Sequence, residues 1–270
     1  GCPAEAFGFY PTDHEGADSI LTECGRGIIF GDDRTLKRYA GNPHIEKHGT
    51  GRSKIILGDD LADDWTDHLD VIVESIASNG GRSCINASCI ITPRHGRALA
   101  DAVAERLAAI EPAALDDPDA QLAGFANVQM ADWMDGAIDE ALAEDDSAVD
   151  LTAARRSGPR KQTVADTTYL RPTLVWCDAF DHPLANTEFL FPFASVVELP
   201  QAEVLQRIGS SLVVSAITED SAFIERLVEC SDIDRLNVGS LPTNRVQWDQ
   251  PHEGNLFEFL YQRRAVQRAG

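Results

Sequence analysis

The sequence predicts an α/β protein with a mostly parallel sheet, and three observations support this prediction. Short apolar runs such as 54–57 and 85–91 alternate with segments whose apolar residues recur at helical spacing. Segments that contain glycine or proline, such as 157–159, separate many of these runs. The chain has 270 residues, of which 43 % are hydrophobic and 25 % charged, as in globular proteins of one large or two ordinary domains.

The first fifth of the chain reads as the alternation of strands with a helix. We predict strands at 6–10, 27–30 and 45–48, and the segment 17–23 between the first two predicts a helix. A further short apolar run predicts a strand at 54–57, which opens the second part of the chain.

The middle of the chain combines one strand with three helices. Apolar residues recur every three or four positions across 61–78, which predicts a helix, and the run 85–91 predicts a strand. An Ala- and Leu-rich helix is predicted at 93–110, with proline at its start and Glu111-Pro112 after its end. Another helix is predicted at 131–144.

The last part of the chain returns to alternating strands and helices. The segment 145–162 is polar and charged and contains Ser157-Gly158-Pro159, so it predicts an exposed loop. Strands and helices then follow in turn. The predicted strands are 174–177, 195–199, 212–217 and a terminal 256–260, and the predicted helices are 201–208 and 221–230.

Composition argues against several classes of function. The net charge of −21, from 44 acidic and 23 basic residues, disfavours nucleic-acid binding, which requires basic patches. No apolar run is long enough to span a bilayer, so we expect no membrane association. The six cysteines show no zinc-ligand spacing, so no metal site is expected, and reduced thiols in a cytoplasmic protein fit this large chain better than disulfides.

Cys84 ends the most informative segment of the chain, Asn79-Gly80-Gly81-Arg82-Ser83-Cys84. This glycine-rich turn separates a predicted helix from a predicted strand, so it holds the thiol at a loop tip, where a nucleophile can reach a substrate. A cysteine thiolate is strongly nucleophilic and a good leaving group. The alternative is that Cys84 is a small buried hydrophobic residue, which is what we expect of Cys89 in the following strand.

The segment resembles the Asn-x-Gly-x-x-Cys nucleophile signature of the aldehyde dehydrogenase superfamily, with Arg82 in place of the usual Gln. Other stretches resemble motifs of the same family, in the same order and at similar spacing across nearly the whole chain. They are Gly1-Cys2-Pro3 through Leu21, Gly27-Ile28-Ile29-Phe30, Gly51-Arg52-Ser53-Lys54-Ile55-Ile56-Leu57 with Asp59-Asp60, Arg171-Pro172-Thr173-Leu174, Glu188-Phe189-Leu190-Phe191-Pro192-Phe193 and Pro251-His252-Glu253-Gly254. Each motif is weak alone, and their shared order is the strong signal.

The resemblance implies an aldehyde dehydrogenase-like fold, with the remnant of a Rossmann-type parallel sheet and an α/β catalytic domain. It assigns 1–50 to the C-terminal part of the nucleotide-binding domain, 51–248 to the catalytic thiol domain and 249–270 to a tail that serves oligomerisation. The chain begins without Met in a strand-like segment, so we expect the C-terminal portion of a longer enzyme. A shortened but functional variant is the alternative.

The activity that the resemblance implies is the oxidation of an aldehyde, with NAD or NADP as the cofactor. The Cys84 thiolate attacks the aldehyde carbonyl, hydride passes to the nicotinamide, and water or coenzyme A releases the acyl group from the thioester. The Cys84 backbone N–H, at a turn, is suited to donate to the oxyanion. The implied partners are a small-molecule aldehyde and further copies of the chain in a homo-oligomer.

His48 is the sequence-based candidate for the general base. Members of the family that hydrolyse the thioester use a Glu in Glu-Leu-Gly-Gly-Lys, and alignment on Gly51-Arg52-Ser53 puts His48 at that position, followed by Gly49 and Thr50 beside the cofactor. A neutral imidazole can take a proton from water near pH 7. A structural histidine at a strand end is the equal alternative. Glu46 replaces it only if the alignment slips, and strand alternation puts Glu46 on the same face.

Glu188 is the sequence-based candidate for cofactor binding. It matches the family Glu that accepts hydrogen bonds from the nicotinamide ribose, and its alternative role is a surface acid before an apolar strand. The family's Thr-Gly-Ser near the cofactor phosphates is replaced by Gly31-Asp32-Asp33, whose carboxylates repel a pyrophosphate.

Four functions stay open. An NAD(P)-dependent aldehyde dehydrogenase leads, since it accounts for Cys84 and Glu188 together. A coenzyme A-acylating aldehyde dehydrogenase or acyl-coenzyme A reductase is the alternative, because such enzymes often lack the Glu base. A non-catalytic homologue accounts for Asp32, Asp33 and the missing base, and a Cys/His hydrolase is a distant fourth.

Overall fold

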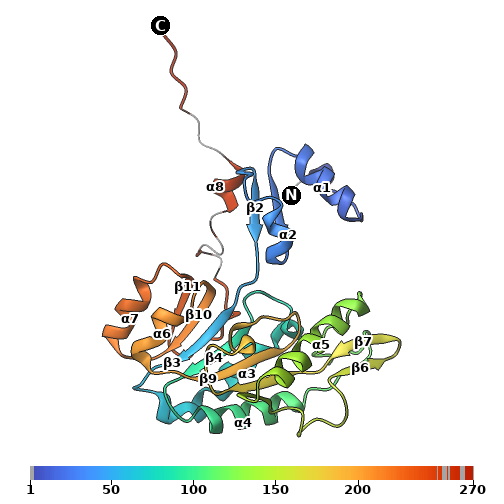
Figure 1. The fold of residues 1–270 in the computed structure, drawn as a ribbon. Helices are drawn as coiled ribbons and strands as arrows, with labels where there is room; N and C mark the ends of the chain where they lie inside the picture. The colour runs from blue at the N-terminus through green and yellow to red at the C-terminus, as the bar shows by residue number, and fades with distance from the viewer. Residues whose placement is uncertain (1–2, 248, 251–253, 255, 262–264, 270) are drawn as a thin grey trace. The chain divides into compact units, whose positions relative to one another are not determined.

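A computed structural model describes residues 3–247, 249–250, 254, 256–261 and 265–269 of the 270-residue chain (Figure 1). The chain divides into two compact units, one formed by residues 1–50 with 254–270 and the other by residues 51–253. Among the described residues, no helix is both long and apolar enough to cross a membrane.

The first unit contains a parallel pair of strands. Strands β1 (Gly27–Phe30) and β2 (Ile45–His48) pair from Gly27 opposite Ile45 to Phe30 opposite His48, and α2 (Asp33–Lys37) lies in the connection between them. This βαβ connection, with the parallel pair, is a small piece of the predicted Rossmann-type sheet. The other elements of the unit are η1 (Ala4–Ala6), α1 (His14–Glu23) and α8 (Leu256–Leu260).

Two strand predictions in the first unit are wrong. Residues 7–10 form an irregular segment after η1, and Phe9 is 90 % exposed, so the apolar run 6–10 does not contribute to a buried strand face. The run 256–260 is the helix α8, which brings the Phe257 ring beside the Tyr261 ring one turn later, with centroids 5.0 Å apart and the ring planes tilted by 32°. Five apolar-rich residues are too few for periodicity to distinguish a helix from a strand. The motif residues 251–253 lie outside the described residues.

The second unit is built on a seven-stranded sheet with the order β11-β10-β3-β4-β9-β8-β5. Neighbouring strands are parallel except β5, which pairs antiparallel with β8 at one edge. The strands are β3 (Ser53–Leu57), β4 (Ala87–Thr92), β5 (Ala148–Asp150), β8 (Thr173–Cys177), β9 (Phe193–Glu198), β10 (Ser211–Ile217) and β11 (Ile233–Val238).

Helices cover both faces of this sheet, as the two apolar clusters show (Figure 1). On one face, α3 (Leu69–Ala77) and α4 (Gly96–Ala108) pack Ile72, Ile76 and Leu99 against the strands. On the other face, α5 (Val128–Glu144), α6 (Gln201–Arg207) and α7 (Ser221–Val228) pack residues such as Ile138 and Phe223. The central strands are therefore buried on both sides, which explains why they read as continuous apolar runs rather than as alternating patterns.

Two segments of the second unit differ from their predictions. The predicted helix 61–78 is interrupted, because η2 (Ala62–His68) is a 3₁₀ segment with non-helical dihedral angles at Asp64, and regular α-helix begins only with α3. The predicted loop 145–162 contains the edge strand β5 and enters a hairpin of β6 (Lys161–Val164) and β7 (Thr167–Leu170) beside α5. The side chains of β6 are exposed or half-buried, so its sequence is polar and resembles a loop.

Candidate active site

Three loops that precede neighbouring strands form the candidate site. Arg52 immediately precedes β3, Cys84 precedes β4 and Glu188 precedes β9, and these strands are consecutive in the sheet. Because the strands are parallel, their amino-terminal ends lie side by side at the same end of the sheet, and the three loops meet there. The turn at Gly51 and Arg52 contacts both other loops, since Gly51 packs against the Cys84 backbone and the Arg52 N–H binds Glu188.

A left-handed turn carries the chain from α3 to Cys84. Asn79, Gly80 and Gly81, within η3 (Ser78–Gly81), have φ angles of 55°, 62° and 66°, a conformation that glycine adopts without cost. A side chain at Gly81 would overlap the backbone of Phe191 and Pro192, so glycine is also required by the close packing of the loop that bears Glu188. The two loops are thus held together by a backbone contact.

Asn86 holds the Cys84 loop against α3. Its buried side-chain amide donates to the carbonyls of Ser75 and Ser78, at 3.0 Å each, and its side-chain oxygen accepts from the Ser83 N–H at 3.0 Å. A buried amide that is satisfied in this way fixes the loop geometry. Sequence reasoning missed this residue, since an Asn at the start of an apolar run gives no sign of its partners.

Arg82 ties the same loop to the segment after α4. Its guanidinium lies over the Phe125 ring, 4.1 Å from the centroid, and donates to the carbonyls of Ala123 and Gly124 at 3.3 and 2.9 Å. Arg82 is therefore a structural anchor of this loop.

Cys84 is half-buried beside Ile85, Leu212 and Val213. Its carbonyl oxygen accepts from the Ser53 hydroxyl at 2.8 Å, and a side chain at Gly51 would overlap that same carbonyl. The turn before β3 therefore supports the backbone that carries the thiol. Cys89, by contrast, is fully buried on β4, as the sequence predicts.

Glu188 is half-buried and accepts the Arg52 backbone N–H at Oε2, at 2.6 Å. Burial raises its pKa from 4.5 to about 7, although hydrogen bonds from the Arg52 and Gly51 backbone and the positive charges of Arg52 and Lys54 oppose the shift. A carboxylate at the site edge, already oriented by a backbone donor, can accept hydrogen bonds from sugar hydroxyls.

Lys54 is a buried residue at this end of the sheet that sequence reasoning did not assign to the site. Its side chain is fully buried on β3, and Nζ donates to the Arg52 carbonyl at 2.6 Å and to the Ser211 hydroxyl at 2.9 Å. Burial lowers its pKa from 10.5 to about 8. The available signal was a lysine inside an otherwise apolar run, because lysine is almost never fully buried without a specific partner.

The other three predicted site residues, His48, Gly49 and Thr50, belong to the first unit. The His48 ring stacks on Phe30, with centroids 4.9 Å apart, and its Nε2 lies 3.3 Å from a Glu46 carboxylate oxygen. His48 and Glu46 thus share a face of β2, as strand alternation predicts. The Thr50 hydroxyl lies 3.4 Å from Asp33 Oδ1, and Gly49 lies beside the same carboxylate and Leu36.

Asp32 has a local structural role. Its carboxylate caps the five-residue helix α2 by accepting the Thr35 N–H at 2.7 Å, and hydrogen bonds from Thr35 lower its pKa. The amino end of α2 is therefore occupied by the protein's own anion. The repulsion between the carboxylates of Asp32 and Asp33 and a pyrophosphate stays a prediction.

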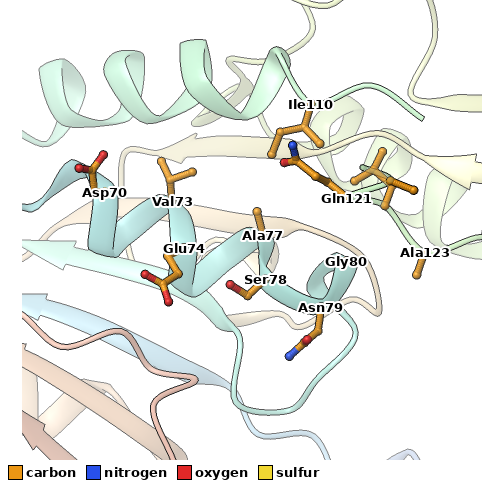
Figure 2. Close-up of a pocket in the computed structure, with 12 residues that line it drawn as sticks. Asp70, Val73, Glu74, Ala77, Ser78, Asn79, Gly80, Ile110, Gln121 and Ala123 are labelled. Carbon is orange, nitrogen blue, oxygen red and sulfur yellow. The ribbon is translucent and has the colours of Figure 1, made fainter. Parts of the chain in front are cut away.

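A pocket of about 670 Å³ opens beside α3 and the turn at Asn79 and Gly80 (Figure 2). Side chains of α3 and η3 form one wall, from Asp70 to Gly80, and Ile110 with residues 120–123 forms the other. Among the described residues, neither Cys84 nor Glu188 lines it, so we do not assign it to the reaction. No group of three or more His, Cys, Asp or Glu side chains in the described part of the chain could hold a metal ion.

Comparison with solved structures identifies the fold. The chain is similar to an NAD+ complex of aldehyde dehydrogenase from Bacillus cereus (TM-score 0.67, 14 % identity, 83 % of this chain and 45 % of that chain). It is also similar to an NADP complex of glyceraldehyde-3-phosphate dehydrogenase from Methanocaldococcus jannaschii (0.69, 15 %, 88 % and 50 %). A third similar structure is aldehyde dehydrogenase 21 from Physcomitrella patens with the product succinate (0.70, 15 %, 90 % and 50 %).

These similarities show that the chain has the aldehyde dehydrogenase fold over the matched part, which confirms the predicted fold class. The chain spans about half the length of these solved structures. No protein-family model matches the sequence, and no curated protein matches it.

Proposed function

We propose that this chain is the thiol-bearing part of an aldehyde dehydrogenase-like oxidoreductase that oxidises an aldehyde with NAD or NADP. The observation that supports this proposal most is the packing of the Cys84 and Glu188 loops around one turn, at one end of the sheet of this fold. The proposed reaction needs a nucleophile and a nicotinamide held close to it, and a carboxylate that binds the nicotinamide ribose would hold the cofactor in place.

Cys84 acts first in the proposed reaction. The thiolate forms a C–S bond to the aldehyde carbon, and the carbonyl electrons move to oxygen, where a backbone N–H stabilises the oxyanion. A bound nicotinamide supplies the hydride acceptor. As hydride leaves the former carbonyl carbon, a thioester to Cys84 forms. Water then adds to the thioester and displaces the thiolate, which leaves the carboxylic acid and restores the enzyme.

Glu188 is the residue that we assign to the cofactor, through hydrogen bonds from the ribose hydroxyls to its carboxylate. The carboxyl at Asp32 does not fit a phosphate, because it already occupies the amino end of α2. We therefore assign no phosphate contact to that turn. Gly49 and Thr50 remain cofactor candidates on the sequence alignment alone, and His48 remains the candidate base for the hydrolysis step on the same basis.

The test is aldehyde-dependent NADH or NADPH formation by the protein in its full natural length. Replacing Cys84 by Ser should lower the rate on the order of a thousandfold or more, because the hydroxyl is a far weaker nucleophile than the thiolate. The matched control is Cys230→Ser, at a half-buried cysteine after α7, which should keep the wild-type rate.

Two further outcomes decide between the alternatives. If NADH or NADPH formation requires coenzyme A, the thioester transfers its acyl group to the coenzyme A thiol instead of to water, and the protein catalyses the acylating reaction. A folded protein that forms no reduced nucleotide with any aldehyde would contradict the proposal and indicate a non-catalytic homologue.

A further inference from the structure

Lys54 of β3 links the neighbouring strand β10 to the turn at Arg52, whose N–H binds Glu188. Its Nζ donates to the Ser211 hydroxyl at the start of β10 and to the Arg52 carbonyl before β3, at 2.9 and 2.6 Å. The Ser211 hydroxyl in turn lies 3.1 Å from the Gly209 carbonyl. A single buried ammonium group therefore fixes the position of the Arg52 carbonyl relative to the start of β10.

Arg52 needs such support because its backbone is strained. Its φ angle of 44° is left-handed, a conformation that is sterically unfavourable for a residue other than glycine. Both sides of the residue are held, since the N–H binds Glu188 at 2.6 Å and the carbonyl binds Lys54. Strained residues persist where surrounding contacts over-determine them, and these two contacts do so here.

The stability of the fold does not by itself explain why a lysine is buried at this position. Removing an ammonium from water disfavours its charged form, and a methionine of similar length fills the same space without that cost. The charged and titratable groups that act on Lys54 are Cys89 on β4, Arg52 and Glu188. Glu188 is the acid among them, and its carboxylate is favoured by the positive charge of Lys54.

We propose that Lys54 is a positioning residue for the nucleotide-binding carboxylate, which holds the Arg52 carbonyl so that the Arg52 N–H stays on Glu188 and which favours the Glu188 carboxylate by its positive charge. The inference rests on the proposed function only in the identity of the ligand. Its structural part, the dependence of Glu188 on Lys54, holds or fails independently.

The first experiment measures that dependence without any ligand. Carboxyl ¹³C NMR follows the titration of Glu188, whose signal is assigned by its absence in Glu188→Gln. In Lys54→Met the midpoint should move to higher pH, because a positive charge and the support of a backbone donor are both lost. The matched control is Lys161→Met, at an exposed lysine of β6 that pairs with Asp132, and it should leave the midpoint unchanged.

The second experiment measures NAD and NADP binding by the full-length protein at pH 7. Lys54→Met should raise the Kd about fivefold or more, because a smaller fraction of Glu188 is ionised, and raising the pH should restore the wild-type affinity. Lys161→Met should bind as the wild type does. A mere packing role for Lys54 would give a loss that does not depend on pH.

The outcomes separate the two proposals. An unchanged Glu188 midpoint in Lys54→Met overturns the role of Lys54, whatever the enzyme does. A shifted midpoint in a protein that binds neither nucleotide supports the link and contradicts the proposed function. If Lys54→Met does not fold, Ser211→Ala removes the other acceptor of Nζ and should move the midpoint in the same direction by a smaller amount.

Discussion

Glu188 is the residue whose protonation couples the site to folding. Its pKa is about 7 in the folded chain and 4.5 in a solvated chain, so between these values the folded state binds more protons than the unfolded state. The stability that Glu188 contributes is therefore present at low pH and is lost as the pH rises through that window.

Replacing Glu188 by Gln should remove this pH dependence. We expect the free energy of unfolding, measured by urea titration at pH 4.5 and pH 7, to fall less with pH in the variant than in the wild type. Glu225→Gln, at an exposed glutamate of α7, is the matched control and should follow the wild-type curve. Equal slopes for all three proteins would show that Glu188 is not desolvated.

The residues of the site were predictable to different degrees. Cys84 and Glu188 stand in recognisable motifs, so the sequence alone singled them out. Lys54 acts through hydrogen bonds to the nearby Arg52 carbonyl and to the Ser211 hydroxyl on a distant strand, and Asn86 binds carbonyls of the preceding helical segment. Neither residue stands in a sequence pattern that reveals these partners. Interior polar residues of this kind become visible only when the strand order is known.

At the scale of elements, the packed turn Asn79-Gly80-Gly81 sets the geometry of the site. Its left-handed backbone ends the helical segment and brings Gly81 against Phe191 and Pro192. The turn and the Glu188 loop cannot shift independently, because backbone meets backbone at this point.

Replacing Gly81 by Ala should destabilise the second unit by about 2–4 kcal/mol, since it adds left-handed strain to a steric overlap with backbone. The matched control is Gly136→Ala in α5, where no atom lies within 4 Å of the added carbon. There the same change should stabilise the helix by about 0.5–1 kcal/mol. Urea titration measures both, and equal effects would contradict the packing role of Gly81.

Most elements of the second unit were predictable, because buried parallel strands and amphipathic helices have strong sequence patterns. The prediction failed at exposed or short elements. The β6–β7 hairpin has a polar first strand, and β5 has three residues. The edge strand β11 was not predicted, because its two buried residues, Arg235 and Asn237, are polar. In the first unit, α8 has only five residues. In such segments few buried positions constrain the sequence, so periodicity carries little information.

For the whole molecule, the net charge of −21 is the dominant electrostatic property. Its 44 acidic residues outnumber its 23 basic residues, so mutual repulsion disfavours the compact state despite local ion pairs. Arg160, for example, pairs with Asp135, Asp139 and Asp150 and offsets part of this repulsion locally.

Raising NaCl from about 0.05 to 0.5 M should therefore increase the urea concentration at the unfolding midpoint near neutral pH. Near pH 4.5, where the net charge is close to zero, the same salt change should have little effect or the opposite one. A midpoint that falls with salt near neutral pH would show that attractive ion pairs outweigh the repulsion.

The strand order also determines when during folding the site can exist. The four strands at its edge, β10, β3, β4 and β9, come from segments spread between residues 53 and 217, and each is parallel to its neighbours. Such long-range pairings form late and slowly. During synthesis, the Cys84 thiol leaves the ribosome well before the segment that carries Glu188, and β10 follows later still. The nascent chain therefore carries an unshielded thiol until its last central strand docks, so early oxidation is a hazard inherent in this topology.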